Sequence, residues 1–474
     1  MVLIKNLVIA LAVGLAAAAA LALGAAPALA VSVTWMKGFA APSTPARYDK
    51  VGVIKVGPSS ARNVLVLEPG TSAGGAYFVP LATWIVARVP DWQVWSVERR
   101  ENLLEDQSAL NAAKHGRISG RQLFDYYLGY LADPSITHHF QMLDNRKLGF
   151  AKQWGMNVAV QDLHRVIAAA RRRGGKVVLG GHSLGGGVVT AYATWDFSGR
   201  PGADDLAGLV YIDGGSFRTL SPAAAQAALT ALNAPTASPW LSFGGIPAPF
   251  AGLYNATGSL GALIDPNSPS LGQEFPALPP SLKPPERATN LGQYGYALNV
   301  GTSPPSLAAA QAHLGRGIAA RGPIHGWDGR GALTPIKRYA TMFAGAGVDS
   351  ADGTEWYFPV RLTDDSGAVA NGISNPAQTI LGVHATFGRR LPRSLLIYAF
   401  GAALGGQLVL DGAKQLAQQS HIPASHLVLV NRQRSYAHND PNGAYPRNAF
   451  FGALLPFLRR VAPRPAPPGF NGLG

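Results

Sequence analysis

The sequence has no cysteine and few charged side chains. Without cysteine, disulfides, thiolate metal sites and a cysteine nucleophile are all excluded. Charged residues make up 14% of the 474 positions, whereas 47% are apolar and Gly (56) and Pro (36) are plentiful. Charged residues usually account for about 25% of a chain, and a disordered chain would be less apolar. The composition therefore predicts a compact body with long, turn-rich connections.

Signatures of nucleotide and metal binding are also missing. The sequence has no G-x-G-x-x-G, and the glycine-rich segment 69–75 lacks the lysine and the spacing of a phosphate-binding P-loop. Asp349, Asp352 and Glu355 do not have the spacing of an EF-hand and fit a polar turn better. We therefore expect no nucleotide, no metal and no cofactor.

The chain is basic, with a formal charge of +14 and a pI of about 10. A basic chain can be attracted to nucleic acid or to anionic lipid. Here the Lys and Arg residues are scattered, and the run 171–173 ends a helical pattern, where cations are favourable. We expect a solvated surface and no nucleic-acid partner. Transient contact with a membrane or lipid surface stays compatible with this charge.

The N-terminus has the pattern of a secretory signal. Lys5 precedes an apolar run over 7–26, and Ala28-Leu29-Ala30 puts small residues at the two positions that a signal peptidase reads. We expect a signal peptide over 1–30 and a protein that is secreted or held in the periplasm or cell envelope. The alternative is an uncleaved anchor, because the run approaches the roughly 20 residues that span a bilayer.

Short apolar runs alternate with helical patterns along most of the chain. Runs closed by turn residues suit buried strands, and apolar residues at helical spacing indicate helices. Strands are expected at 47–56, 63–68, 92–97, 176–181, 207–212, 394–400 and 426–430, and helices at 120–131, 158–173, 184–195, 407–419 and 449–461. This alternation predicts an α/β fold with a mostly parallel central sheet flanked by helices. Ligands of such sheets gather at the C-terminal ends of the strands.

Residues 216–390 interrupt the alternation once. Prolines are frequent in this segment, as in Leu278-Pro279-Pro280, and strand patterns are weak. We interpret the segment as a largely helical or irregular cap inserted over the site. It divides the expected core into a first part, 31–215, and a second part, 391–474.

A glycine-flanked serine lies between an expected strand and an expected helix. The motif reads Gly181-His182-Ser183-Leu184-Gly185. A sharp strand-to-helix turn strains the backbone at the serine, so its near neighbours must be small. The hydroxyl then projects above the sheet at a helix N-terminus, where the dipole favours developing negative charge. The motif predicts Ser183 as a nucleophile and the Leu184 backbone N–H as an oxyanion donor.

The order of these elements resembles the α/β-hydrolase superfamily. It runs strand, Gly-His-Ser-Leu-Gly-Gly, helix, strand, insertion, strand, helix, strand and histidine, over nearly all of the chain after residue 30. In that family the serine is activated by a histidine in the loop after the last strand. The resemblance implies His438 as this base. The simpler alternative is a surface histidine in a turn.

The resemblance leaves the acid between two aspartates. Relatives usually carry it just after the penultimate strand, but the segment 401–407 has no carboxylate. Asp411 is the first available there, and it falls in the second turn of an expected helix. Some relatives place the acid after the strand that follows the nucleophile helix, where Asp213 stands. We favour Asp213, for which capping a turn is the simpler role, and keep Asp411 as the alternative.

A second oxyanion donor is implied in the loop 69–75. This loop follows the expected strand at 63–68 and resembles the family's His-Gly element, with Pro69 where histidine is usual. We expect the Thr71 backbone N–H to be the donor, with that of Ser72 next.

Together these residues predict an exported serine hydrolase that cleaves carboxylic esters through an acyl-enzyme. The expected substrate is a small-molecule or lipid-like ester, because aromatic residues of the cap such as Trp240, Tyr254 and Phe343 suit an acyl pocket, although they equally suit a core. Acyltransferase, thioesterase or peptidase action stays open, because a fold does not determine chemistry. A non-catalytic exported binding protein also stays open, since no acid follows Phe400. The sequence does not determine the oligomeric state.

Overall fold

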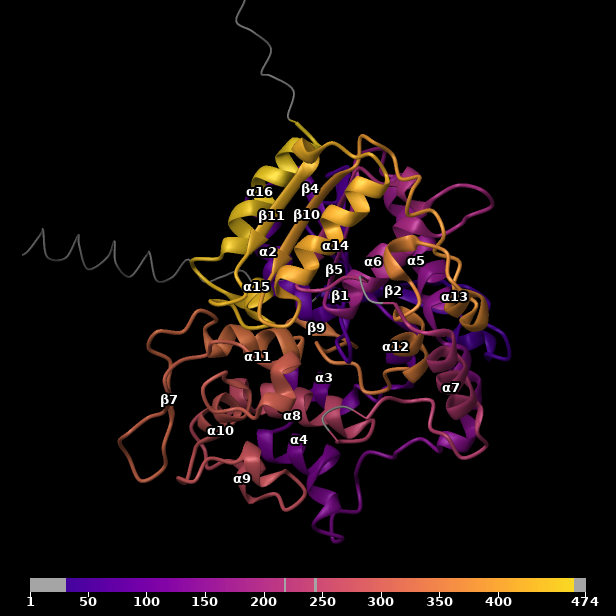
Figure 1. Ribbon diagram of the computed structural model, residues 1–474. Coiled ribbons are helices and arrows are strands. Elements are labelled where there is room, and N and C mark those ends of the chain that lie inside the picture. The colour runs from indigo at the N-terminus through magenta and orange to yellow at the C-terminus, as the bar shows by residue number, and fades with distance from the viewer. Residues whose placement is uncertain (1–30, 217–218, 243–244, 464–474) are drawn as a thin grey trace, which may run out of the picture.

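The computed structural model describes residues 31–216, 219–242 and 245–463, so the expected signal peptide lies outside the described residues. One nine-stranded sheet runs through the molecule in the order β11-β10-β6-β5-β3-β4-β2-β1-β9 (Figure 1). Its strands are β1 (Val31–Lys37), β2 (Lys50–Val56), β3 (Asn63–Glu68), β4 (Trp92–Glu98), β5 (Val177–His182), β6 (Gly208–Ile212), β9 (Val348–Asp349), β10 (Leu396–Gly401) and β11 (Leu427–Asn431). β2 is antiparallel to β1 and β4, and the other neighbouring pairs are parallel. The predicted α/β class with a mostly parallel sheet is confirmed.

The sheet is covered on both faces. Leu65 and Leu67 of β3 pack on one face, whereas Val64 and Val66 pack on the other, as the two-residue period of a strand requires. Two helices cover the first face and three cover the second (Figure 1): α2 (Val79–Val86) and α16 (Ala449–Val461), then α5 (Met156–Arg171), α6 (Leu184–Thr194) and α14 (Gly406–Gln419). Because both faces are buried, the strands are apolar throughout, which is why they stand out in the sequence.

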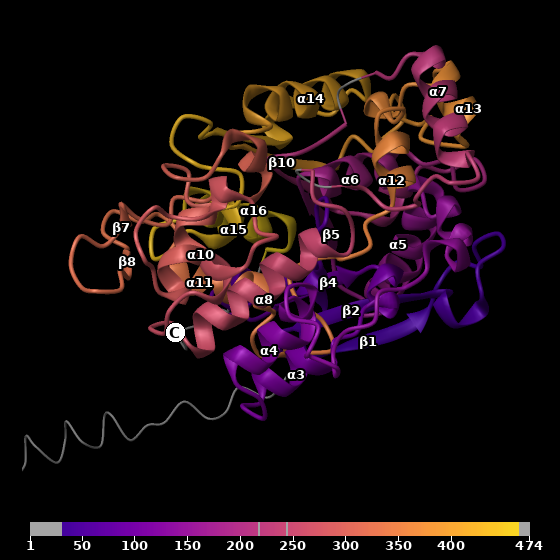
Figure 2. The same ribbon diagram turned by 90° about the horizontal axis from the view of Figure 1, so that it is seen from below.

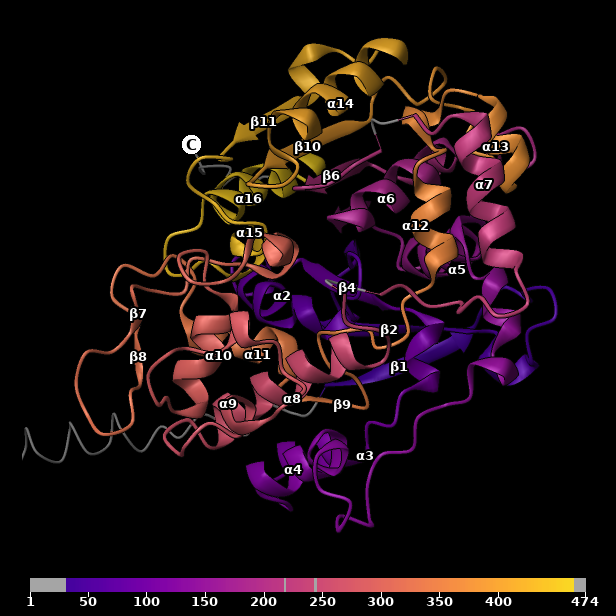
Figure 3. The same ribbon diagram turned by 60° about the horizontal axis from the view of Figure 1, so that its bottom comes forward.

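The segment 216–390 does not form one body. Its helices separate into two groups (Figures 2 and 3), one beside α5 and α6 and the other beside α3 and α4. The first group is α7 (Pro222–Asn233), α12 (Val360–Ser366) and α13 (Pro376–Leu381). The second is α8 (Phe250–Ile264), α9 (Leu271–Glu274), α10 (Asn290–Leu298) and α11 (Ile336–Ala344), joined by α3 (Ser108–Lys114) and α4 (Gly120–Tyr127). A small antiparallel pair, β7 (Gly317–Ile318) and β8 (Trp327–Asp328), follows α10.

This arrangement differs from the expected boundaries of the cap. β9 belongs to the cap segment by sequence, yet it pairs in parallel with β1 at the edge of the main sheet. α3 and α4 belong to the first core part by sequence, yet they pack on α8. The cause is burial of apolar surface: Leu123 and Tyr127 of α4 share one buried cluster with Leu253 and Leu260 of α8. Short amphipathic helices like these can bury such faces only against one another.

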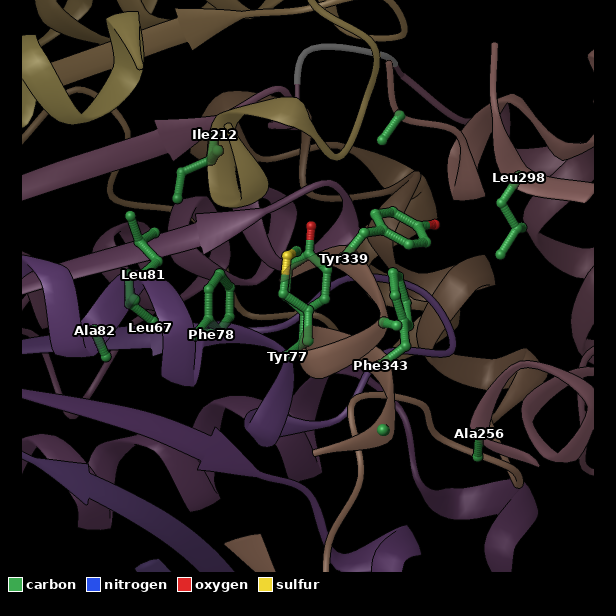
Figure 4. Close-up of a cluster of buried hydrophobic side chains, with 14 of the residues drawn as sticks. Leu67, Tyr77, Phe78, Leu81, Ala82, Ile212, Ala256, Leu298, Tyr339 and Phe343 are labelled. Atoms are coloured by element: carbon green, nitrogen blue, oxygen red, sulfur yellow. The ribbon is translucent and has the colours of Figure 1, made fainter. Parts of the chain in front are cut away.

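One apolar cluster joins the sheet to the cap helices. Figure 4 shows Leu67 of β3 and Leu81 of α2 in the same cluster as Tyr339 and Phe343 of α11 and Ala256 of α8. The cap helices of the second group therefore share their core with the sheet.

Two findings apply to the described ranges only. None of their helices has both the length and the apolar character needed to cross a bilayer. They also contain no cluster of three or more histidine, aspartate or glutamate side chains arranged to hold a metal ion.

Candidate active site

Ser183 lies on the turn between β5 and α6. Its φ of 57° and ψ of −126° are strained for a residue with a side chain. The turn is tight, because a Cβ on Gly181 would lie 2.3 Å from the carbonyl oxygen of Gly185. Ser183 N donates to the carbonyl of Ile212 on β6 (3.0 Å), and its own carbonyl accepts from Gly186 N (2.9 Å). These contacts hold the serine at the N-terminus of α6.

His438 lies in the loop between β11 and α15 (Asp440–Gly443), and it lines two hollows together with Ser183. Its side chain is 2% exposed, and its Nδ1 is 2.6 Å from Oδ2 of Asp213, whose side chain is fully buried. With Nδ1 paired to Asp213, Nε2 is the ring nitrogen of His438 that is left free to accept a proton. Among the described residues Ser183 Oγ makes no hydrogen bond, and contacts of this kind often tighten only when substrate binds.

Asp213 is held by the loop that follows β10. Its carboxylate accepts hydrogen bonds from four backbone N–H groups, those of Ala402 (2.6 Å), Gly405 (2.9 Å), Gly406 (3.1 Å) and Leu404 (3.2 Å). This loop leads into the N-terminus of α14, where the helix dipole favours an anion. Burial acts to raise the pKa of Asp213, but the hydrogen bonds from His438 and Ala402 outweigh it and the pKa lies below its usual value. The carboxylate therefore stays charged beside His438.

This arrangement accounts for the missing acid after β10. β6 and β10 are neighbouring parallel strands in which Ile212 pairs with Phe400, so Asp213 lies at the same edge of the sheet as the loop after β10. That loop supplies N–H donors, and β6 supplies the carboxylate. Of the two predicted acids, the structure brings Asp213 to His438 and leaves Asp411 outside the site. The Asp411 side chain is 55% exposed on α14 and bonds Gln407 Nε2 at 2.8 Å.

Two buried rings support the loop of His438. The Tyr77 hydroxyl donates to Asn439 Oδ1 (2.7 Å) and accepts from Asn442 Nδ2 (2.9 Å). The His182 ring stacks on Tyr77 with 5.5 Å between centroids, and its Nε2 lies 2.9 Å from the carbonyl oxygen of His438. Because a carbonyl only accepts, Nε2 of His182 carries the proton. Burial, and then the His438 ring, lower the pKa of His182 to about 3, so this ring stays neutral.

The loop 69–75 approaches Ser183 from the end of β3. A Cβ on Gly70 would lie 2.8 Å from Ser183 Cβ, so only glycine fits there. Thr71 and Ser72 line the same pocket as Ser183 and His438. Within the described ranges, the N–H groups of Thr71, Ser72 and Leu184 donate no hydrogen bond. All three predicted oxyanion donors are therefore free to bind a ligand oxygen.

Arg99 is a buried residue of the site that sequence patterns alone did not single out. Its guanidinium donates to three loop carbonyls and two carboxylates, those of Pro69 (3.0 Å), Gly70 (2.8 Å), Ala73 (2.9 Å), Glu68 (2.9 Å) and Glu355 (2.9 Å). Burial raises the pKa of Glu68 to about 7, although Arg99 counteracts the rise. The available signal was the run 98–100, where charged residues directly follow a buried strand at the edge that carries the site.

The three candidate side chains come in the chain order serine, aspartate, histidine. Ser183, Asp213 and His438 each follow a strand of one mostly parallel sheet, with the serine on a strained strand-to-helix turn. This order on this type of turn distinguishes the α/β-hydrolases from other serine hydrolases. The chain has the α/β-hydrolase fold. The resemblance predicted from the motif order is thereby confirmed at the level of the fold.

Comparisons with known proteins find similarity to solved structures only. No family model and no curated protein matches this chain. A soluble variant of monoglyceride lipase from Saccharomyces cerevisiae, bound to a substrate analog, is 10% identical with a TM-score of 0.40, over 91% of this chain and 95% of that one. The thioesterase domain from the curacin biosynthetic pathway is 11% identical with a TM-score of 0.39, over 90% and 99%. The monoacylglycerol lipase of Paleococcus ferrophilus is 11% identical with a TM-score of 0.38, over 87% and 99%.

The pairing of Asp213 with His438 predicts unequal effects of two matched substitutions. Asp213→Asn removes the charge that orients His438, so we expect hydrolysis of p-nitrophenyl acetate to slow on the order of 10³-fold to 10⁴-fold. Asp411→Asn makes the same change on an exposed helix face and should leave the rate within about twofold. Thermal unfolding of both variants controls for folding. Equal rates in the two variants would contradict the pairing.

Proposed function

We propose that this protein is a serine hydrolase that cleaves carboxylic esters with apolar acyl groups. The observation that carries the proposal is the 2.6 Å hydrogen bond between His438 Nδ1 and Asp213 Oδ2, beside a serine on a strained turn. An imidazole oriented by a charged aspartate is the group that activates a serine hydroxyl, which is a weak nucleophile by itself.

In the first half of the proposed reaction, Ser183 Oγ attacks the ester carbonyl and its proton passes to Nε2 of His438. The carbonyl oxygen becomes an oxyanion, to which the N–H groups of Thr71 and Leu184 donate hydrogen bonds. Asp213 stabilises the imidazolium without taking its proton. When the tetrahedral intermediate collapses, the carbon–oxygen bond to the alcohol breaks and His438 returns the proton to the leaving oxygen.

In the second half, water replaces the alcohol. His438 takes a proton from the water, whose oxygen attacks the acyl carbon bound to Ser183 Oγ. Collapse of this intermediate breaks the bond to Ser183, which recovers its proton from His438, and the carboxylic acid leaves. No cofactor enters either step.

The pocket around Ser183 supports a neutral substrate. Its described lining has no lysine, arginine, aspartate or glutamate, and its members from the cap are Ala251, Gly252, Asn255, Ala309, Ala310, Phe343 and Thr354. A pocket without a charged side chain has nothing to pair with a charged chain end, so a neutral ester fits it better than a peptide terminus does.

The case for a non-catalytic binding protein rested on the absence of an acid after Phe400. Asp213 now stands at the position where such an acid would contact His438, so that argument no longer favours the alternative. We further propose that the protein is exported. This proposal rests on the sequence of residues 1–30 alone.

The assignment of Ser183 predicts that a fluorophosphonate probe labels the protein at that residue. Ser183→Ala should abolish labelling and slow hydrolysis of p-nitrophenyl butyrate by roughly 10⁴-fold or more, because no other side chain takes over the attack. Ser59→Ala, the same change at an exposed serine of a turn, serves as the control and should behave like the parent. Parent-rate hydrolysis by Ser183→Ala would refute the proposed mechanism.

A further inference from the structure

A second cavity adjoins the Ser183 pocket. It has a volume of about 150 Å³ and is lined mainly by α4, α8, α9 and α10, which lie together in the lower part of the molecule in Figure 1. Ala251, Asn255 and Ala310 line both hollows. The cavity therefore lies next to the pocket that contains the serine, and these three residues stand at the boundary between the two hollows.

The walls of this cavity are apolar. None of its described lining residues carries a charge, and its large side chains include Phe124, Leu128, Phe275, Leu278, Leu282 and Leu298. The buried Thr257 hydroxyl has no hydrogen-bond partner among the described residues, but other polar side chains in the lining have protein partners. The Tyr294 hydroxyl donates to Asn255 Oδ1 (3.0 Å), and Gln293 Nε2 donates to the carbonyl of Leu282 (3.0 Å). Hydrocarbon is the ligand that such a surface favours.

We propose that this cavity binds the acyl chain of the ester and makes the protein selective for medium- and long-chain acyl groups. This inference rests on the proposed function and names its substrate class. In this proposal the acyl chain of the substrate lies along α8. Ala251, Asn255, Gly258 and Gly261 of this helix line the cavity three or four residues apart, so they share one helix face. The ten residue steps from Ala251 to Gly261 correspond to about 15 Å along the helix axis.

We assign the acyl group of the ester to this cavity because the hollow on the other side of Ser183 is more open to solvent. There, Ser183 and His438 line a different hollow, together with Leu404 and Leu408, which are 47% and 48% exposed. That side opens to solvent. In acyl-enzyme chemistry the alcohol leaves first while the acyl group stays bound to Ser183. The less open cavity suits the group that stays, and the more open hollow suits the group that leaves.

Two glycines on α8, Gly258 and Gly261, leave space in the cavity for the acyl chain of the substrate. No atom lies within 4 Å of a Cβ built on Gly261, and the nearest atom to one on Gly258 is a ring carbon of Tyr294 at 3.4 Å. Glycine is otherwise unfavourable within a helix. Larger side chains at these positions would therefore enter the cavity without disturbing the helix.

The test introduces larger side chains into the cavity at two positions along α8, Gly261 and Gly258. In Gly261→Phe we expect kcat/KM for p-nitrophenyl palmitate and laurate to fall about tenfold or more, and for the acetate to stay within about twofold, since each displaced methylene loses apolar burial. Gly258→Leu lies closer to Ser183, so the octanoate should fall as well. Gly261→Ala also raises helix propensity, by more than phenylalanine does, while filling little space, and it should keep the parent profile.

Failure of this proposal is distinguishable from failure of the proposed function. If the parent protein neither hydrolyses p-nitrophenyl acetate nor reacts with the fluorophosphonate probe, the function itself is refuted. Retained acetate hydrolysis with the parent chain-length profile in both Gly261→Phe and Gly258→Leu would refute only the acyl cavity. A series of alkyl acetates supplies a third outcome: if the variants change the dependence on the alcohol chain, the cavity holds the alcohol and the proposal is overturned.

A different observation carries a second inference. We infer that Arg99 is a positioning residue that orients the oxyanion donor Thr71. The Gly70 carbonyl accepts from Arg99 at 2.8 Å. The Gly70–Thr71 peptide is trans, so the Thr71 N–H points opposite to that carbonyl, away from Arg99. Gly70 and Thr71 line the pocket together with Ser183, whereas Arg99 does not line it, so we place the pocket on the side to which this N–H points.

Arg99 also holds the rest of this loop. The carbonyls of Pro69 and Ala73 accept from the same guanidinium, and the Ser72 carbonyl accepts from Glu355 N at 3.0 Å. Five N–H donors in a planar fork make arginine the side chain that can serve three carbonyls and two carboxylates together. Lysine has one compact ammonium and cannot reproduce that fork.

Arg99→Lys keeps the positive charge but removes the planar guanidinium with its five N–H donors. It therefore tests the orientation of the Thr71 N–H separately from the charge. We expect kcat for p-nitrophenyl butyrate to fall about tenfold to a hundredfold with KM nearly unchanged, because the oxyanion is bound only in the transition state. Inhibition by an alkyl trifluoromethyl ketone, which forms a tetrahedral adduct, should weaken by a similar factor. Arg100→Lys is the matched control. Arg100 is equally buried and is paired with Asp162 and Asp49, but it does not contact the loop.

Equal kinetic effects of Arg99→Lys and Arg100→Lys would overturn the inference, as would a loss confined to thermal stability. If Arg99→Lys does not fold, Glu355→Gln replaces it, since this variant keeps Arg99 and weakens only one of its anchors. Its kcat should fall by a smaller factor at unchanged KM. A parent-like kcat in that variant would count against the role of Arg99.

Discussion

The Asp213 carboxylate is the point on which the geometry of the site depends. A charged carboxylate away from water is unfavourable by several kcal/mol unless it is paired and hydrogen-bonded. Here the loop after β10 supplies four N–H donors and His438 supplies a fifth contact. Removing any of these elements would leave the buried charge with fewer hydrogen bonds. The same interactions that orient His438 therefore also hold β6, the start of α14 and the loop after β11 together.

A second buried charge organises the opposite wall of the pocket. Arg99 is surrounded by Glu68 and Glu355, and the carbonyls of the loop 69–75 complete its hydrogen bonds. Glu355 comes from the segment that the sequence assigned to the cap, so this wall is built jointly by the sheet and the cap segment. Arg99 fixes three carbonyls of this loop, and we propose that it thereby orients the Thr71 N–H toward the pocket.

The cap helices and the sheet are parts of one packed structure. Tyr339 and Phe343 of α11 share a cluster with Leu67 and Leu81 beneath the site (Figure 4). Exposing a large apolar side chain of this kind is unfavourable by roughly 1.5–3 kcal/mol, so lifting α11 from the sheet would be opposed by each of them. The apolar cavity along α8 is formed where this second group of helices meets the Ser183 pocket, and the substrate proposal depends on that junction.

Local sequence determined the elements that position the serine. Apolar runs closed by turn residues predicted β3, β4, β5, β6, β10 and β11, and α16 spans the expected range 449–461. These strands are buried on both faces, so their own composition marks them. Glycines around Ser183 marked the turn because only small residues fit there. β9 escaped prediction, since it is two residues long and exists only through its pairing with β1.

Only the tertiary structure decided which residues meet at the site. Asp213 and Asp411 were both plausible by position, and the choice depended on β6 and β10 being neighbours, which no local pattern specifies. In the sequence, Arg99 is only one charged residue of a short run. Its contact with Glu355, which is distant in sequence, exists only in the folded chain. The boundaries of the cap likewise followed from which apolar faces pack together. Contacts between residues far apart in sequence have no local signature, because they depend on the packing of the whole chain.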